Sequence, residues 1–125
     1  VGRPAGPRPQ GAGLHALNPR RDPWPGDPGA ARAEVEWEHR ALRAADAILF
    51  WFPGEAACEI SLYELGAWSM TAKPLFLGVH PDYRRRFDVI AQTALARPDV
   101  RIRGDLASAV ADAIAQVQKG ATHVR

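Results

Sequence analysis

From residue 30 onward, the apolar positions follow two different spacings along the chain. A recurrence every three or four residues predicts helices over 30–45, 61–72, 85–96 and 106–119, the last of them ended by Gly120. Continuous apolar runs predict buried strands over 47–52 ("AILFWF") and 74–79 ("PLFLGV"), and "VRIR" over 100–103 predicts a short outer strand. Strands that alternate with helices indicate an α/β fold, in which a parallel sheet is covered on both faces.

The first thirty residues have a different character, because they hold seven of the eleven prolines and six of the eleven glycines. Only "LHAL" over 14–17 resembles a strand there. A chain of 125 residues is one domain by length. We therefore expect a disordered leader over 1–13, a single α/β domain over 14–120 and a tail over 121–125.

Composition and charge argue against several classes of protein. A net charge of +2, with Lys and Arg spread along the chain, disfavours a nucleic-acid-binding protein. The longest apolar run, 44–52, is interrupted by Asp46 and is too short to span a membrane. Cys58 is the only cysteine, so the chain has neither an internal disulfide nor a Cys/His pattern for a metal. We expect a cytoplasmic protein without a metal or cofactor.

Glu38 is a carboxylate whose position needs an explanation. It falls within the apolar stripe of the helix predicted over 30–45, which is formed by Ala31, Val35, Leu42 and Ala45. A buried carboxylate without a partner is costly. Glu38 therefore either pairs with an arginine or with solvent at the edge of the stripe, or it serves a cleft.

Glu64 is open to two interpretations. Ser61 and Glu64 have the spacing of a capping box, in which both side chains only bond backbone N–H groups at the start of a helix. Alternatively, Glu64 is a carboxylate kept ionised near a helix N-terminus and suited to attack an electrophilic sugar carbon. Asp46, before the strand over 47–52, has the alternative role of accepting hydrogen bonds in the helix-to-strand turn.

Sites on parallel sheets lie at the carboxyl ends of the strands, which directs attention to the loops over 53–60 and 80–84. In these loops His80 lacks a second ligand for a metal, and Cys58 lacks a nearby histidine that would activate its thiol. The arginines over 84–86 have the pattern of a solvated surface, with a phosphate contact as the alternative.

Four segments, taken in order, resemble the nucleoside 2-deoxyribosyltransferases and the related nucleotide N-glycosidases. They are "LNPRR" over 17–21, "VEWEHRALRAADAILFWFP" over 35–53, "ISLYELGAW" over 60–68 and "LGVHPDYRRRFDVIAQ" over 77–92. The glutamate of "ELG" stands eighteen positions after the aspartate of "AD", which makes the ordered combination specific.

The resemblance implies a flavodoxin-like fold, a three-layer sandwich around a parallel sheet. It implies that Glu64 is the nucleophile, and that Glu38, where many members have Asp, contacts the sugar and assists proton transfer to the base. The segment over 54–59 corresponds to the sugar-contacting loop of the family, with Cys58 where relatives often have a polar ligand. The residues expected to bind the substrate are Asp46, Pro53, Gly54, Cys58, Ser61, Gly66 and His80.

The amino end departs from the family pattern. Relatives begin with a central strand that ends in a segment like "AGP", and "PAGPRP" over 4–9 resembles that segment. The span over 8–16 is too short for the helix and strand that should follow. We therefore expect the first strand and helix to be missing or remodelled, either in a truncated chain or in one whose gap a partner subunit fills. An open sheet edge and the family pattern both favour a homo-oligomer.

Three functions stay open from the sequence. The first is transfer of a ribosyl or deoxyribosyl group between bases on a small-molecule nucleoside or nucleotide, through a covalent intermediate on Glu64. The second is an N-glycosidase that keeps this nucleophile and uses water as the acceptor. The third is a non-catalytic subunit that binds a nucleotide or a partner chain without turnover.

Overall fold

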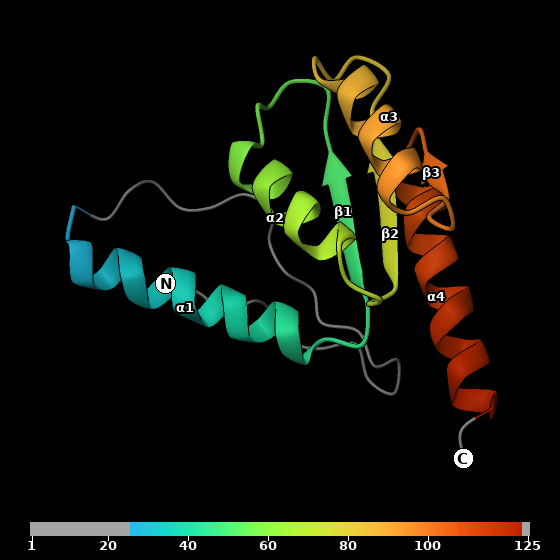
Figure 1. Ribbon diagram of the computed structural model, residues 1–125, viewed down its shortest axis with the longest axis horizontal. Coiled ribbons are helices and arrows are strands. Elements are labelled where there is room, and N and C mark those ends of the chain that lie inside the picture. Colours follow the sequence, from blue (N-terminus) through green and yellow to red (C-terminus); the bar gives the residue numbers. More distant parts are fainter. Residues whose placement is uncertain (1–25, 124–125) are drawn as a thin grey trace. The chain divides into compact units, whose positions relative to one another are not determined.

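The computed structural model describes residues 26–123, with side chains over 26–119. The chain forms two compact units, Val1–Asp46 and Ala47–Arg125, and each is described by itself (Figure 1). The leader expected over 1–13 and the strand expected over 14–17 lie outside the described residues.

The first unit contributes the helix α1 (Pro28–Ala44), which the sequence predicts over 30–45. Asp27 caps its N-terminus, because the carboxylate accepts a hydrogen bond of 3.0 Å from the Gly29 N–H. Pro28 suits the first helical position, because an N–H at that position would have no partner within the helix and proline has no N–H. The helix ends where the backbone becomes extended at Ala45.

The second unit is built on a three-stranded sheet of β1 (Ile48–Phe52), β2 (Leu75–Val79) and β3 (Ile102–Arg103), in that order. Both pairs are parallel, with Ile48 beside Leu75 and Leu77 beside Ile102. The three strands predicted over 47–52, 74–79 and 100–103 are present, although β3 is only two residues long. Within residues 26–123 no strand pairs with the outer edge of β1, and the homo-oligomer stays a prediction.

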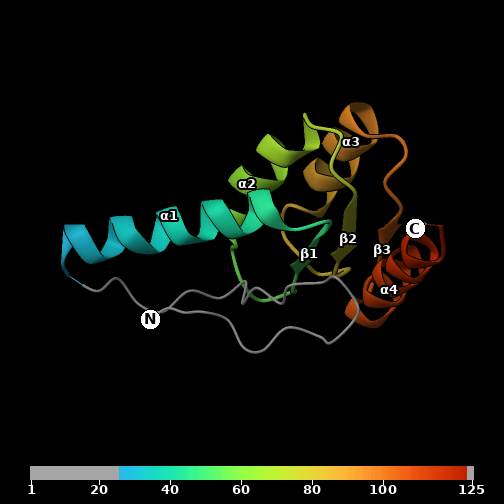
Figure 2. The ribbon, with the colours of Figure 1, turned by 90° about the horizontal axis from the view of Figure 1, so that it is seen from below.

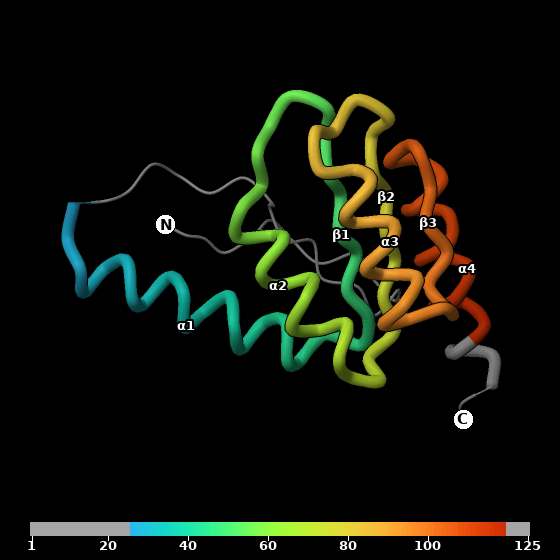
Figure 3. The backbone as a smooth tube through the Cα atoms, turned by 45° about the horizontal axis from the view of Figure 1, so that its top comes forward, coloured from blue at the N-terminus to red at the C-terminus, as the bar shows by residue number. Residues whose placement is uncertain are grey.

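Helices cover both faces of this sheet. The helices α2 (Glu59–Ser69) and α3 (Arg86–Ala96) lie side by side on one face, and α4 (Leu106–His123) crosses the other (Figures 1 and 2). The backbone tube in Figure 3 shows the same order of layers. This three-layer α/β arrangement confirms the fold class predicted from the sequence, and it is consistent with a flavodoxin-like fold.

Several predicted helix ends are wrong, most of all in α2 and α4. The helix α2 is Glu59–Ser69 rather than 61–72, so it begins two positions and ends three positions before the prediction. The helix α4 continues through Gly120 to His123, because one interior glycine costs only about 1 kcal/mol relative to alanine. None of α1 to α4, the helices among residues 26–123, has an apolar stretch of the length that a bilayer requires.

The core of the second unit lies between the strands and the two helical layers. Its largest fully buried side chains are Phe52, Leu77 and Val79. On α4 the buried positions are the small Ala109 and Ala113, which allow this helix to contact all three strands closely. The apolar runs of the sequence thus become strands that are buried by helices on both sides.

The contact between β2 and the start of α4 depends on a glycine. A Cβ on Gly78 would lie 2.8 Å from Cε3 of Trp51 and 3.2 Å from the carbonyl oxygen of Asp105. Asp105 also caps α4, since its carboxylate accepts hydrogen bonds from the backbone N–H and the hydroxyl of Ser108 at 2.7 and 3.0 Å. These bonds lower the pKa of Asp105 below its ordinary value.

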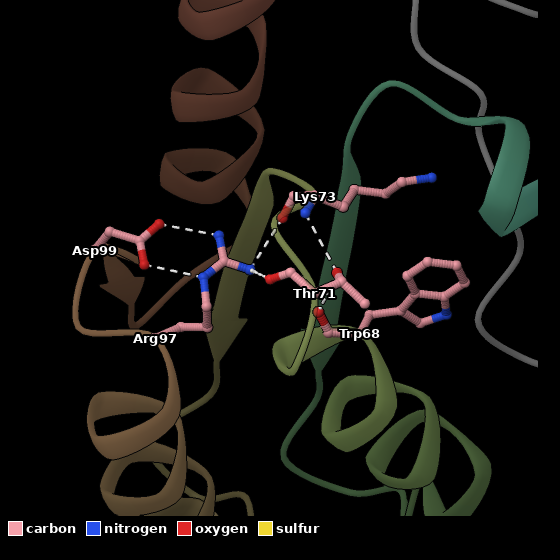
Figure 4. Close-up of polar contacts among 5 residues, drawn as sticks. All are labelled: Trp68, Thr71, Lys73, Arg97 and Asp99. Carbon is pink, nitrogen blue, oxygen red and sulfur yellow. Dashed lines mark hydrogen bonds and ion pairs between the residues drawn. The ribbon is translucent and has the colours of Figure 1, made fainter.

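At the amino end of the sheet, Arg97 joins the loops that lead into β2 and β3 (Figure 4). Its Nε and Nη2 donate to the two carboxylate oxygens of Asp99, each at 2.9 Å. Its Nη1 donates to the carbonyl oxygens of Thr71 and Lys73 at 3.1 and 3.0 Å. The hydrogen bond from Arg97 lowers the pKa of Asp99, and the same bond raises the pKa of Arg97.

A second ion pair connects β3 to α4. Nε and Nη2 of Arg103 donate to the two carboxylate oxygens of Asp112 at 2.8 and 3.0 Å. This bidentate contact lowers the pKa of Asp112. The short strand is therefore fixed as much by side chains as by its backbone hydrogen bonds.

Candidate functional site

Two loops follow the carboxyl ends of neighbouring strands, residues 53–58 after β1 and residues 80–85 after β2 (Figure 1). Parallel pairing brings these ends to the same edge of the sheet. The ladder continues past the strand ends, because the His80 N–H donates to the Phe52 carbonyl oxygen at 2.8 Å. The loops that the sequence singled out therefore start side by side.

Gly54 and His80 are the expected substrate-binding residues that the structure brings together. A Cβ on Gly54 would lie 2.9 Å from Nδ1 of His80 and 3.3 Å from Cβ of Asp82. Nδ1 of His80 accepts a hydrogen bond of 3.0 Å from the Asp82 N–H, which assigns the hydrogen of the neutral ring to Nε2. The ring of Trp51 meets His80 edge-on at 6.4 Å between centroids. His80 thus presents one N–H donor in a fixed orientation.

Tyr83 is a residue of this edge that the sequence did not single out. Its hydroxyl donates a hydrogen bond of 2.6 Å to the carbonyl oxygen of Ala57, in the loop after β1. Its ring lies 5.1 Å from that of Phe52. Burial, with a smaller contribution from nearby Cys58, raises the pKa of Tyr83. The signal in the sequence that could have identified Tyr83 is its position just after a strand. A tyrosine that is buried there needs a hydrogen-bond partner for its hydroxyl.

The start of α2 tests the capping-box interpretation of Glu64. The residue before the helix is Cys58, in the left-handed region at φ 54° and ψ 45°, and no side chain caps this end. The backbone begins the helix instead, with the Leu62 N–H donating to the Cys58 carbonyl oxygen at 3.0 Å. Ser61 is already the third helical residue, so the predicted capping box of Ser61 and Glu64 is wrong.

Glu64 lies in the second turn of α2 and is half-buried. It adjoins the buried stripe of this helix, which contains Leu65 and Ser69. Helical side chains lean toward the N-terminus of their helix, which here is the end that follows β1. The Cα–Cβ bond of Glu64 therefore leans toward the end of α2 that follows β1.

The remaining expected site residues are less informative. Pro53 is half-buried in the loop after β1, whereas Gly66 is exposed and a Cβ there would meet nothing within 4 Å. Close approach of α2 to the sheet therefore does not explain this glycine. Asp46 is exposed, and its side chain accepts no hydrogen bond from the described residues. The alternative role of Asp46 in the turn is thus wrong.

Glu38 is half-buried on α1, in the first unit. On the same helix, Arg32 pairs instead with the more exposed Glu36, at 2.9 Å. The convergence of Glu38 and Glu64 in one hollow stays a prediction, because each belongs to a different unit. Among residues 26–123 there is no group of three acidic, histidine or cysteine side chains placed to hold a metal.

The three arginines over 84–86 are not equivalent. Arg84 and Arg85 are exposed as predicted, and Arg85 lies 3.6 Å from the carboxylate of Asp88. Arg86 is half-buried, and its Nε is buried without a hydrogen-bond partner among the described residues. The solvated surface predicted for this stretch therefore applies to its first two members.

Comparison with known proteins agrees with the resemblance noted in the sequence. The family described as "Nucleoside 2-deoxyribosyltransferase like" matches residues 8–83, which is more than half of the chain. No curated protein matches the chain in sequence. The family match contains β1, the loop after it, α2 and β2, and it ends at Tyr83. Because the match covers more than half of the chain, the chain belongs to the nucleoside 2-deoxyribosyltransferase-like family.

Proposed function

We propose that the chain cleaves or transfers the N-glycosidic bond of a nucleoside or deoxynucleoside, through a covalent glycosyl intermediate on Glu64. The observation that supports this most directly is the start of α2 at Glu59, two positions before the predicted start, which rules out the capping box of Ser61 and Glu64. The family match supports the reaction class, since it includes Glu64 and both strands whose ends adjoin α2.

In the proposed reaction, a carboxylate oxygen of Glu64 forms a bond to C1′ of the sugar as the bond from C1′ to the base nitrogen breaks. The electron pair of that bond goes to the base, and Glu38 supplies the proton that neutralises it. A second base nitrogen, or water, then attacks C1′ and passes its proton to Glu38, which restores the acid as the bond from C1′ to Glu64 breaks and releases the carboxylate. Transfer and hydrolysis thus share the first step and differ only in the acceptor.

Glu64 is half-buried at the edge of the packed stripe of α2, so its side chain is partly accessible, as a nucleophile requires. The macrodipole of α2 contributes less than the sequence suggested, because the helix starts two residues earlier and the effect falls off within the first turn.

The substrate contacts proposed here come from the paired loops. His80 offers the Nε2–H as a donor to a sugar hydroxyl or a base carbonyl. Gly54 leaves space beside that ring, and Cys58 places its thiol at the start of α2. Following the family resemblance, we also assign to the substrate-binding residues Pro53, Ser61, Asp46 and Gly66.

The decisive experiment compares Glu64→Gln with Glu36→Gln, a matched change at an exposed glutamate of α1. We expect Glu64→Gln to lower base release from a panel of nucleosides at least about a thousandfold, and Glu36→Gln to leave it within about twofold. A 2-fluoro-2-deoxy nucleoside should add one glycosyl mass to the wild type, at Glu64. Base release that survives Glu64→Gln, or a wild type that leaves every nucleoside unchanged, would reject the proposal.

The acceptor is identified in the same assay. Adding a second free base separates the two reactions, because a transferase forms a new nucleoside whereas a hydrolase releases free sugar at the same rate as before. We expect exchange of the base to compete with release of sugar, with the product ratio rising as the concentration of the acceptor base rises.

A further inference from the structure

Tyr83 connects three parts of the carboxyl edge. Its backbone N–H donates to the His80 carbonyl oxygen at 3.0 Å, which fixes the residue relative to the end of β2. Its ring packs on Phe52 at the end of β1, and only 3% of the residue is exposed. Its hydroxyl then reaches the Ala57 carbonyl oxygen at 2.6 Å. One residue therefore connects both strand ends to the loop just before α2.

The hydroxyl is not needed for packing, since phenylalanine has nearly the same volume. A buried hydroxyl is costly unless it is bonded, so its single directed bond to Ala57 is the feature to explain. That carbonyl belongs to the peptide group between Ala57 and Cys58, whose orientation is coupled to φ of Cys58. This φ is 54°, a value that a residue other than glycine adopts only when its surroundings support it.

The position of Glu64 follows from the direction in which α2 starts. Glu59 is the first residue of the helix, so Glu64 lies about 7.5 Å further along its axis. A tilt of about 8° at the start would therefore move the Glu64 backbone by about 1 Å. A misplacement of about 1 Å can reduce the rate of a reaction about a hundredfold.

We propose that Tyr83 is a positioning residue for the reaction proposed above: its hydroxyl holds the peptide group before Cys58 and thereby the direction of α2 and the place of Glu64. The inference rests on the proposed function, because Glu64 needs a fixed place only if it attacks a sugar carbon. At neutral pH the hydroxyl stays a donor, since burial raises its pKa from 10.0. Tyr83 itself makes no contact with the reacting atoms in this proposal.

The test compares Tyr83→Phe with Tyr63→Phe, the same change at a tyrosine of α2 that is 79% exposed. We expect Tyr83→Phe to lower kcat about 10- to 100-fold while KM changes less than about threefold, because the proposed contacts from Gly54 and His80 remain and the nucleophile is displaced. Tyr63→Phe should leave both constants within about twofold. Near-ultraviolet circular dichroism of each variant at the assay temperature gives the folded fraction, so that kcat is expressed per folded molecule.

Amide hydrogen exchange provides a readout that does not depend on turnover. In Tyr83→Phe the amides of residues 57–62, including the Leu62 N–H that closes the first turn of α2, should exchange at least about tenfold faster than in Tyr63→Phe. Unchanged exchange, or an unchanged kcat in an active enzyme, would overturn the inference and leave the proposed function standing. A wild type without base release would overturn the proposed function, and the role of Tyr83 in it, whatever the variants show.

Discussion

The two ends of the sheet in the second unit are held together in different ways. At the amino end, the Arg97 guanidinium makes four hydrogen bonds, two to Asp99 and two to the carbonyl oxygens of the loop before β2. At the carboxyl end, the loops meet through the close contact of Gly54 with His80 and the single hydrogen bond of Tyr83. Polar groups at the amino end thus satisfy one another, whereas Nε2–H of His80 has no partner among the described residues.

This difference separates stability from chemistry within one small unit. The Arg97 guanidinium donates four of its five N–H groups within the protein, so it rigidifies the amino end and offers little to a ligand. Gly54 at its close contact with His80, and Cys58 at a positive φ, each cost the folded state some stability. A fold tolerates such costs where a site needs a specific backbone conformation. The amino end therefore stabilises the sheet, and the carboxyl end presents the groups that the proposed reaction uses.

The largest expected effect on stability is at the amino end. Arg97→Ala removes four hydrogen bonds and leaves the Thr71 and Lys73 carbonyl oxygens without this donor. We expect the free energy of unfolding to fall by about 2–3 kcal/mol, as is typical when charged hydrogen bonds to partly buried groups are lost. Urea denaturation measures the change, and kcat per folded molecule should stay within about twofold. If kcat per folded molecule fell together with the free energy of unfolding, the two ends of the sheet would not be separate in function.

The pH dependence gives a control for that variant. The pKa of Asp99 is lowered from 3.8 in the folded wild type, chiefly by the hydrogen bond from Arg97. The ion pair of Asp99 with Arg97 therefore contributes fully to stability at pH values above 3.8, the ordinary pKa of Asp99. The contribution is lost as the pH falls through the lower pKa of Asp99 in the folded protein. The difference between wild type and Arg97→Ala should therefore shrink at acid pH. A difference that does not change down to about pH 2 would contradict the assignment to the ion pair.

At the carboxyl end, Gly54→Ala should affect activity more than stability. The new Cβ would lie 2.9 Å from Nδ1 of His80, so the ring or the loop after β1 must shift. We expect kcat/KM for base release to fall about tenfold or more, with a stability loss of about 1 kcal/mol, smaller than that of Arg97→Ala. Gly104→Ala is the matched control, because a Cβ there meets nothing within 4 Å. Equal activities in the two variants would mean that the contact with His80 has no role in the reaction.

The sequence predicted what depends on local periodicity and missed what depends on distant pairing. The strands β1 and β2 were found because their residues are apolar on both faces, as burial between two layers of helices requires. The capping box was wrong because a backbone turn at Cys58 starts α2 earlier, and the spacing of Ser61 and Glu64 alone carries no information about that turn. Tyr83 was missed because its partner is 26 positions away.

The smallest expected effect comes from Cys58, and its sign is informative. A protein is usually less stable with glycine than with alanine at the same position, because glycine loses more backbone entropy on folding. At φ 54° the order should reverse, since the left-handed conformation costs a residue with a Cβ about 1–2 kcal/mol. Cys58→Gly should therefore be about 0.5–1 kcal/mol more stable than Cys58→Ala in urea denaturation, although both lack the sulfur. If alanine proved the more stable of the two, the backbone at the start of α2 would not be strained, and the contrast between the two ends of the sheet would lose one of its supports.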